Sequence, residues 1–416
     1  MRNKNWKDLK SWLLKYNAID LSVQDAKDVK RLNLSGHSLE VLPDEFGLLS
    51  NLVALNLANN RLTTLPSSFS NLSRLNTLDI RRNSFEVLPA ALGGLNLASL
   101  NASSNKLSDV SLLFSCLGLR VCDLSFNDLS TLEEGFLKDN SLRTLNLCGN
   151  FFKEVPHGIH NLKALHRLNL SQNMITTVGE EISLLDELLY LNLSDNHIVT
   201  IDKGLFDLPL EMLDLCSNSL ESLELSGLED LEKISLDENP LHRISLQDDF
   251  APYLQEFSCD GCQLEEFIEL QSRRLESLCL SSNKISSIPS SIQRYEKLTH
   301  LDMENNNIKE LPYEMTNMTA LQTLYITDNP LNEEAKEVIK VLHPDICDIN
   351  MKTGITIEKA QHEDLTQMAE LIGLLFEIEK DFQVNFDKQL SGISKLYAYE
   401  GADLLVAKHE GKVIGM

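Results

Sequence analysis

The chain has 416 residues, of which 43% are hydrophobic and 24% are charged, so its composition is that of a folded protein and excludes general disorder. The formal net charge of −25 argues against nucleic acid or an anionic membrane as the main partner. This length favours two or three ordinary domains or one long repeat array.

The eight cysteines are spread along the chain and do not form the clusters typical of disulfide-rich domains. Such scattered thiols are typical of a reducing compartment. No stretch has the length of a signal-peptide core or of a transmembrane helix. We therefore expect a cytoplasmic protein, with delivery into a host cell as an alternative that no sequence feature supports. The composition and the array described below are typical of a bacterial protein.

The first predicted element is a helix in "NWKDLKSWLLKY", residues 5–16. Trp6, Leu9, Leu13 and Tyr16 recur at helical spacing, with Trp12 beside them. A helix lying on a membrane surface would show a similar apolar stripe. Because the segment stands directly before a repeat array, we favour an N-terminal helical cap over residues 1–28.

A repeating frame follows, as in "LVALNLANNRLTTLP" at 52–66 and "LTHLDMENNNIKELP" at 298–312. The frame L-x-x-L-x-L-x-x-N-x-L-x-x-L-P can be followed through fourteen turns. Its Asn position is occupied by His37, Asn60, Asn83, Asn105, Asn127, Asn150, Asn173, Asn196, Asn218, Asn239, Cys262, Asn283, Asn306 and Asn329.

This frame resembles the leucine-rich repeat family over residues 29–345. The resemblance implies an α/β solenoid over residues 29–351, with a curved parallel sheet on its concave face. The alternating leucines predict short strands that bury one face by stacking on their neighbours. The Asn side chains should form a ladder that satisfies backbone groups at the turn after each strand. "NPLNEEAKEVIKVLHPDI" predicts a last turn and a closing helix that ends near Pro344.

Outward-pointing strand residues should form the concave face, where the family usually binds partners. We expect basic residues in the early turns, acidic residues in the later turns, and exposed apolar or aromatic residues between them. The candidate partner-binding residues are Arg81, Arg82, Phe126, Arg167, Tyr190, Met212, Asp214, Asp237, Glu256, Asp302, Glu304 and Tyr325. Arginine and aromatic residues are enriched at protein interfaces, so we predict a protein or peptide partner. That partner should present acidic groups to the early turns and basic groups to the late ones.

No catalytic or metal site is predicted from motifs. "CDGC" at 259–262 would need a second cysteine pair to bind zinc, or a thioredoxin-like context for redox chemistry. In the repeat frame Cys259 replaces an inward apolar residue and Cys262 replaces a ladder Asn, so we favour a structural role. Phosphate-binding loops, nucleophile elbows and H-E-x-x-H motifs are absent from the sequence.

The repeat frame is lost over residues 352–416, where we expect a strand from Ile355 to Glu358, two helices and a hairpin. "ITIEKAQHEDL" at the front and "VAKHEGKVIGM" at the back resemble the opening of a GNAT-type N-acetyltransferase domain. An incidental α/β cap on the solenoid is the alternative interpretation. The resemblance implies that Glu377, Glu379 and Asp381 would lie near the acceptor substrate, although such residues are more often the polar face of a helix.

The GNAT family binds acetyl-CoA through a Q/R-x-x-G-x-G/A loop, which this sequence does not contain. We therefore expect the acetyltransferase domain to be truncated and the chain as written to bind no cofactor. Two functions remain open. One is a scaffold that binds a protein partner on the concave face. The other is a longer acetyltransferase that uses acetyl-CoA and whose repeats recruit a protein substrate.

Overall fold

The structure, a computed structural model of the chain, describes residues 2–115, 118–132, 141–342, 348–350, 355–359, 405–409 and 412–415. The chain divides into two compact units. The first comprises Met1–Thr323 and Asn329–Cys347, and the second comprises Leu324–Asp328 and Asp348–Met416.

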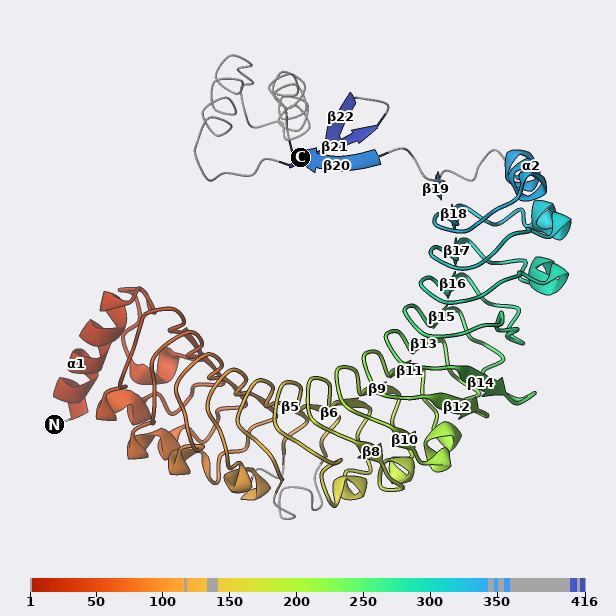
Figure 1. Ribbon diagram of the computed structural model, residues 1–416. Coiled ribbons are helices and arrows are strands. Elements are labelled where there is room, and N and C mark those ends of the chain that lie inside the picture. Colours follow the sequence, from red (N-terminus) through yellow and green to blue (C-terminus); the bar gives the residue numbers. More distant parts are fainter. Residues whose placement is uncertain are drawn as a thin grey trace. The chain divides into compact units, whose positions relative to one another are not determined.

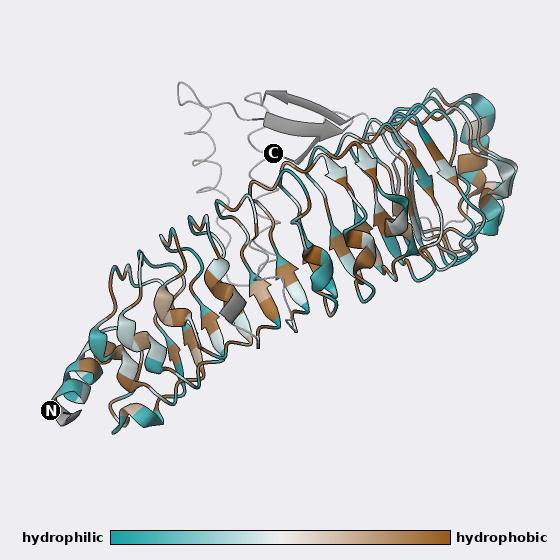
Figure 2. Cartoon of the chain, turned by 90° about the horizontal axis from the view of Figure 1, so that it is seen from below, coloured by the Kyte–Doolittle hydropathy of each residue, from teal (hydrophilic) through white to brown (hydrophobic). Residues whose placement is uncertain are grey.

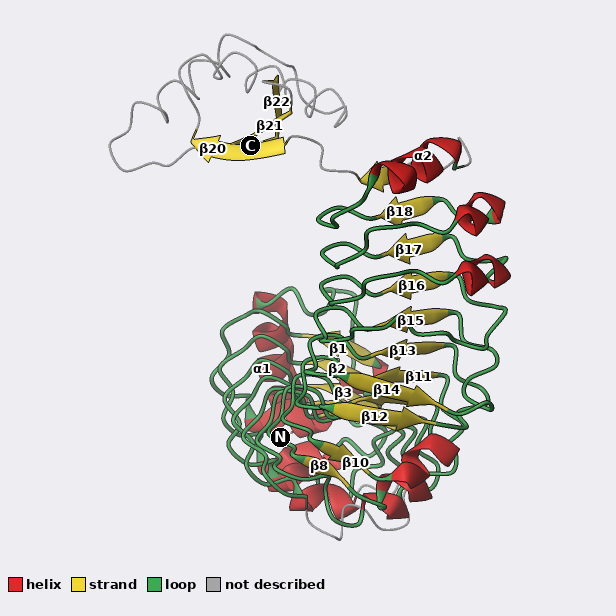
Figure 3. Cartoon of the chain, turned by 45° about the vertical axis from the view of Figure 1, so that its right-hand side comes forward, coloured by secondary structure: helices red, strands yellow, loops and turns green. Residues whose placement is uncertain are grey.

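The first unit is a solenoid whose short parallel strands line the inner side of an arc (Figure 1). Each strand pairs in register with the strand of the next turn, so that Leu55 stands opposite both Leu32 and Leu78. Figure 3 shows the strands stacked side by side. In sheet order they are β1 (Arg31–Asn33), β2 (Ala54–Asn56), β3 (Thr77–Asp79), β4 (Ser99–Asn101), β5 (Val121–Asp123), β6 (Thr144–Asn146), β7 (Arg167–Asn169), β9 (Tyr190–Asn192), β11 (Met212–Asp214), β13 (Lys233–Ser235), β15 (Glu256–Ser258), β16 (Ser277–Cys279) and β17 (His300–Asp302).

The leucine frame explains these strands. Leu52, Leu55 and Leu57 are at most 2% exposed, while the residues between them point away from the core. Figure 2 shows hydrophobic residues recurring at corresponding positions of successive strands. One turn cannot bury its leucines alone, so the stacked turns share one continuous core. The predicted solenoid with a parallel sheet on its concave face is confirmed.

Short 3₁₀ helices cover much of the outer side of the arc (Figure 1). Prolines of the repeat frame, such as Pro43 and Pro66, stand immediately before them. The phenylalanines that follow, Phe46 and Phe69, stack with ring centres 6.0 Å apart. The helices are η1 (Ala26–Asp28), η2 (Asp44–Leu48), η3 (Ser67–Asn71), η4 (Ala90–Leu92), η5 (Ser111–Ser115), η6 (Ile159–Asn161), η7 (Ile182–Leu184), η8 (Lys203–Asp207), η9 (Ser290–Arg294) and η10 (Tyr313–Asn317).

Two pairs of additional parallel strands interrupt this helical covering. β8 (Thr177–Val178) pairs with β10 (Thr200–Ile201), and β12 (Ser222–Leu225) pairs with β14 (Arg243–Leu246). Each pair is a separate two-stranded sheet, so β14 presents an open edge to the following turn.

A helix stands at each end of the first unit. At the start, α1 (Arg2–Lys15) buries Leu9 and Leu13, and the Trp12 ring contacts the Phe46 ring edge-on at 6.5 Å. At the other end, α2 (Glu333–Val341) starts at Asn332, whose side chain accepts the backbone N–H of Ala335 at 2.8 Å. Helix α1 packs against η2 and helix α2 packs against η10, so each covers a turn that would otherwise expose its core to water.

The second unit contains Leu324 and Tyr325 of β18, the strand β19 (Asp348–Asn350) and a three-stranded antiparallel sheet. In that sheet β20 (Ile355–Lys359) pairs with β21 (Leu405–His409), which pairs with β22 (Lys412–Gly415). β18 itself spans Thr323–Tyr325. The two helices predicted between β20 and β21 lie outside the described residues, as do Pro344, Glu377, Glu379 and Asp381.

Candidate functional site

The concave face of the first unit is built from two outward columns of strand residues. In β2 these are Ala54 and Asn56, on either side of the buried Leu55. The first column changes along the array, from Arg31 and Ala54 to Tyr190, Met212 and Lys233. Because its members lie in register on one surface, this column carries the variable chemistry of the face.

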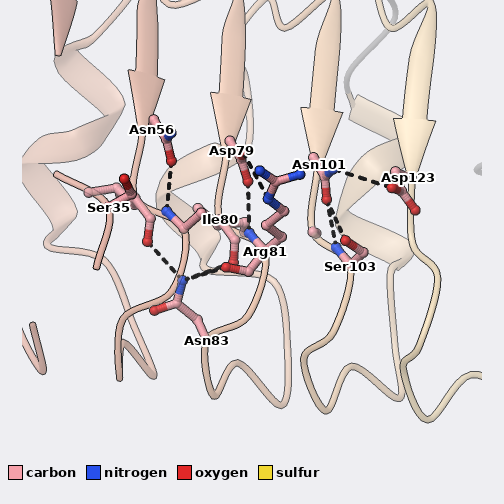
Figure 4. A network of polar contacts seen from close by, with 12 residues as sticks. Ser35, Asn56, Asp79, Ile80, Arg81, Asn83, Asn101, Ser103 and Asp123 are labelled. Carbon is pink, nitrogen blue, oxygen red and sulfur yellow. Dashed lines mark hydrogen bonds and ion pairs between the residues drawn. The ribbon is translucent and has the colours of Figure 1, made fainter. Parts of the chain in front are cut away.

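The second column is nearly constant, and its side chains accept hydrogen bonds from the backbone. The side-chain Oδ1 atom of Asn56 accepts the backbone N–H of Ala58 at 2.9 Å, and Asp79 does the same for Arg81 at 3.1 Å (Figure 4). These contacts close the turn at the end of each strand. Sequence analysis did not identify this column, although its signal is an Asn or Asp one position after the middle leucine. Its members with such a bond are Asn33, Asn56, Asp79, Asn101, Asp123, Asn146, Asn169, Asn192, Asp214 and Asp302.

The ladder residues lie behind this turn and join consecutive repeats. The amide nitrogen of Asn196 donates to the carbonyls of Leu170 and Leu193, both at 3.0 Å. Its amide oxygen accepts the backbone N–H of Ile175 at 3.0 Å. Asn83 is bonded in the same way (Figure 4). Equivalent bonds are made by Asn60, Asn105, Asn127, Asn150, Asn173, Asn218, Asn239, Asn283, Asn306 and Asn329.

Cys262 takes the ladder position in the turn after Asn239, and the preceding sequence explains why a thiol is tolerated. Leu241, after Pro240, donates its backbone N–H to the carbonyl of Asn239 at 2.8 Å, so the next ladder residue need not accept it. A thiol can still donate, and the Cys262 Sγ atom lies 3.5 Å from the carbonyl oxygen of Leu236.

The other half of the C-x-x-C pair also points to a structural role. Cys259 is fully buried, and its Sγ atom donates to that of Cys262 at 2.9 Å. This hydrogen bond and burial raise the pKa of the Cys259 thiol far above its usual value, which disfavours the reactive thiolate. Within the described part of the chain no group of three or more His, Cys, Asp and Glu residues is placed to hold a metal ion.

The second column changes over β13, β15 and β16, where its residues are Ser235, Ser258 and Cys279. After β15 and β16, acids from the preceding turn supply the missing acceptor. The Oδ1 atom of Asp237 accepts the N–H of Asp260 at 2.7 Å, and Asp260 in turn accepts the N–H of Ser281 at 2.7 Å.

This arrangement places carboxylates close together on a half-buried surface. Burial, and then the neighbouring Asp237 charge, raise the pKa of Asp260 to about 6. Burial also raises the pKa of Asp302. Asp237, predicted as a partner-binding residue, is therefore also part of the turn structure.

A cavity of about 270 Å³ opens on the concave face over β6, β7, β9 and β11. It brings together four of the predicted residues, Arg167, Tyr190, Met212 and Asp214. The guanidinium carbon of Arg167 lies 3.7 Å from the centre of the Tyr190 ring, a cation–π contact. Rigid aromatic and arginine groups at the edge of a cavity are typical of interface anchors.

A second cavity, of about 200 Å³, lies on the other side of Tyr190. Its walls include Glu211 and Glu232, while Lys233 is paired with Glu256 at 2.7 Å. The hydrogen bond to the Glu211 carboxylate raises the pKa of the Tyr190 hydroxyl. Glu211 and Glu232 were not among the predicted residues, because each stands one residue before its strand and the prediction considered outward strand residues.

The remaining predicted residues lie at several different places. Arg82 and Phe126 do not belong to the two outward columns, because they occupy the turns after β3 and β5 with φ of +51° and +53°. Arg81 and Arg82 are exposed, and the Arg81 guanidinium lies 3.4 Å from the carboxylate of Asp79. Phe126 is 52% exposed, with its ring over Gly149, and Glu304 is half-buried. Tyr325 is half-buried in β18. The group around Tyr190 brings several predicted members together at one cavity.

Comparison with known proteins places this geometry in a family. The sequence matches the leucine rich repeat family over residues 27–85, 55–107, 140–198, 186–241 and 273–331, which together cover more than half of the chain. The chain belongs to the leucine-rich repeat family. No matched segment extends into the second unit beyond Asp328.

This leucine-rich repeat protein has distant relatives of diverse kinds. It is 28% identical over 183 residues to the adenylate cyclase of Schizosaccharomyces pombe, a match that spans 39% of this chain and 10% of the cyclase. Among solved structures it is similar to a leucine-rich repeat protein of Leptospira interrogans. That likeness has 29% identity and a TM-score of 0.58, over 79% of this chain and 97% of the other. The PEPR1–AtPEP1 complex shares the fold at 24% identity and a TM-score of 0.58, over 80% of this chain and 56% of that one.

Proposed function

We infer that this protein is an interaction scaffold whose concave leucine-rich repeat face binds an extended segment of a protein partner. The observation that carries this function is the cavity over β6–β11, where Arg167 stacks on Tyr190 beside Met212. Tyrosine and arginine lose little conformational freedom when they are already stacked, so their burial by a partner is favourable. The family's general role as a protein-binding scaffold supports the proposal.

The charges around Tyr190 favour a basic group in the partner segment. Glu211 and Glu232 line the second cavity, and Asp214 borders the first. Lys233, the cation of the second cavity, is already paired with Glu256. A lysine or arginine of the partner would therefore meet carboxylates that form no ion pair within the described part of the chain, with its aliphatic stem against Met212.

The early turns favour the opposite charge. Arg31 is exposed at the start of β1 and Arg82 is exposed in the turn after β3, while Arg81 is partly neutralised by Asp79. We propose that acidic groups of the partner face these turns. Such complementary ends would fix the direction in which the segment lies along the array.

A displayed library of random twelve-residue peptides, selected against the full chain, tests this function. Selected peptides should contain a lysine or arginine at one recurrent position. Their affinity should fall at least about tenfold for Tyr190→Ala, because the central aromatic anchor is lost. Thr77→Ala, in the same column five strands before Tyr190, is the matched control. Equal binding of the selected peptides to wild type and Tyr190→Ala would contradict the proposal.

We propose a reducing compartment, the cytoplasm, for this scaffold, because its described cysteines are free thiols set in buried or half-buried repeat positions. Delivery into a host cell stays an alternative. Among the described helices none is long and apolar enough to cross a membrane. Differential alkylation of the protein in intact cells would measure the thiol state, and extensive oxidation would contradict the cytoplasmic assignment.

An acetyltransferase is the second candidate, and the sheet of the second unit supports it. β20, β21 and β22 occur where the acetyltransferase resemblance requires a strand and a returning hairpin, and they pair antiparallel in that order. Acetyl-CoA would be the cofactor, and the repeats would recruit the protein substrate. Intact mass of the native protein, followed by calorimetric titration with acetyl-CoA, tests this candidate. A mass of 46.9 kDa without acetyl-CoA binding would exclude it.

A further inference from the structure

A cavity of about 490 Å³ lies between β14 and the following turn, away from the concave strands. One wall is β14 with Ile244 and Leu246, and the other is the segment 264–269 with Phe267 and Ile268. Ile244, Leu246 and Phe267 are half-buried, so the cavity offers apolar contact area to an occupant. Residues 264–269 form neither a 3₁₀ helix nor a strand.

The backbone of β14 faces this cavity with unused hydrogen-bonding groups. On its other side, Gln247 donates its N–H to the carbonyl of Leu225 at 2.9 Å, which turns the backbone groups of Gln247, Ser245 and Arg243 toward β12. Alternate residues of a parallel strand point both backbone groups to the same neighbour. The N–H and C=O groups of Ile244 and Leu246 therefore point toward the cavity.

The next turn does not take up these groups. Gln263 donates its backbone N–H to the carbonyl of Leu241 at 3.2 Å. Beyond that bond, no hydrogen bond joins 243–246 to 265–269, two segments that the structure describes in full. An edge strand beside an open cavity with some apolar side chains in its walls is the geometry in which an extended peptide adds as a further strand.

The charges at the cavity indicate which peptide fits. Glu265 and Glu266 are exposed and form no ion pair within the described residues. Glu269, farther along, is already held by Arg294 at 3.5 Å. Arg243 is the opposing cation on β14, so the free carboxylates outnumber it at this wall.

We propose that β14 binds an extended segment of a partner protein by strand addition, with apolar side chains toward Ile244 and Leu246 and a lysine toward Glu265 and Glu266. This site is distinct from the concave face and does not depend on the function assigned to that face. Backbone pairing supplies the affinity, and the two carboxylates select a basic residue.

The test uses the full chain and three fluorescein-labelled peptides. Acetyl-Val-Lys-Val-Lys-Val-amide is the probe, and acetyl-Val-Glu-Val-Glu-Val-amide reverses its charge. Acetyl-Val-Lys-Pro-Lys-Val-amide keeps the charge but cannot donate its central backbone hydrogen bond. Fluorescence anisotropy should show the probe binding at least about tenfold more tightly than either of the others. Hydrogen exchange should slow at the amides of Ile244 and Leu246 when the probe is bound.

A charge exchange within the protein separates strand addition from general attraction to an acidic protein. The double variant Glu265→Lys/Glu266→Lys should prefer the glutamate peptide, which inverts the selectivity. Its matched control is Glu154→Lys/Glu310→Lys, because both positions correspond to Glu266 in the repeat and are exposed.

Three results would overturn the proposal. The first is equal binding of the probe and the proline peptide, which would mean that charge alone holds the probe. The second is unchanged exchange at Ile244 and Leu246 with the probe at saturation. The third is protection of those amides without peptide together with a concentration-dependent doubling of mass, which would assign the edge to a second copy of this chain.

Discussion

Asp237 supplies the side-chain acceptor for the backbone N–H of Asp260, at 2.7 Å, across two consecutive turns. In most turns that acceptor belongs to the residue two positions earlier in the same turn, which here is Ser258. The replacement keeps the turn closed but concentrates negative charge, since Asp260 repeats the arrangement with Ser281. The late concave face therefore couples its turn structure to pH.

Replacing Asp260 by Asn should stabilise the protein at neutral pH. Because the fold raises the pKa of Asp260 from 3.8 to about 6, the folded state favours the protonated acid. Its stabilising effect is complete below about pH 4, declines as pH rises to about 6, and is absent above that. Asn keeps the acceptor for Ser281 without the charge. We expect a gain of about 1 kcal/mol at pH 7 after solvent screening, and a smaller gain at pH 4.

Urea unfolding of wild type and Asp260→Asn between pH 4 and 8 measures this difference. Asp248→Asn, an exposed acid, is the control and should change stability little at any pH. A constant difference between wild type and Asp260→Asn across the range would show that the Asp260 charge is not the cause.

The hydrogen bonds of the ladder predict a large loss of stability when one buried asparagine amide is removed. Asn196→Ala removes two donors to buried carbonyls and the acceptor for the N–H of Ile175. Leaving these groups without partners should cost about 3 kcal/mol in the free energy of unfolding.

Cys262→Ala occupies the same repeat position and provides the matched comparison. Its thiol accepts a hydrogen bond from Cys259 at 2.9 Å and makes only long contacts to backbone carbonyls, so its removal should cost about 1 kcal/mol. Both variants are compared by urea unfolding followed by circular dichroism. A similar loss for the two variants would mean that the ladder bonds contribute little beyond packing.

Gly149 is predicted to resist substitution for two separable reasons. Its φ of +65° disfavours any side chain, and an added Cβ atom would lie 2.5 Å from the Phe126 ring. Gly149→Ala should destabilise the protein by about 2 kcal/mol. In Phe126→Ala/Gly149→Ala the steric part should vanish, so the double variant should be more stable than the two single losses predict. Strict additivity in urea unfolding would rule out the ring contact as a cause.

Arg167 should contribute to binding through Tyr190 more than through its own charge. In Arg167→Lys the positive charge stays, but the planar stack on Tyr190 is lost. Affinity for the selected concave-face peptides should fall about fivefold, while Arg82→Lys should have no effect. Anisotropy titrations with one labelled peptide compare the variants. Full affinity in Arg167→Lys would show that charge alone matters.

Much of the solenoid could be predicted from the sequence because its signal repeats. The leucine spacing predicts where strands such as β2 form, and the Asn of each turn predicts the ladder. Pro43 and Pro66 mark the outer segments for the same reason. Because the ladder residue recurs in many turns, an exception in one turn, such as Cys262, does not obscure the pattern.

The candidate site was only partly predictable because side chains from different turns build it. The sequence identifies Tyr190 and Met212 as outward residues, but not the stack on Arg167 or the reach of Glu211 and Glu232. The supporting role of Asp237 depends on Ser258 in the next turn, a relationship that no single repeat contains. The open edge of β14 also has no local sequence signal, because it arises where residues 264–269 of the next turn do not pair with the strand.

The junction between the turns of Asn239 and Cys262 has a mechanical consequence. In a solenoid, tension passes from turn to turn through hydrogen bonds on the inner and outer sides. Here β13 and β15 remain paired on the inner side, whereas the outer side has the open edge of β14 and the ladder has only the sulfur contacts of Cys262. Under an axial pull in optical tweezers, this junction should yield before the others. The array would then behave as two stiff arms that share one compliant joint.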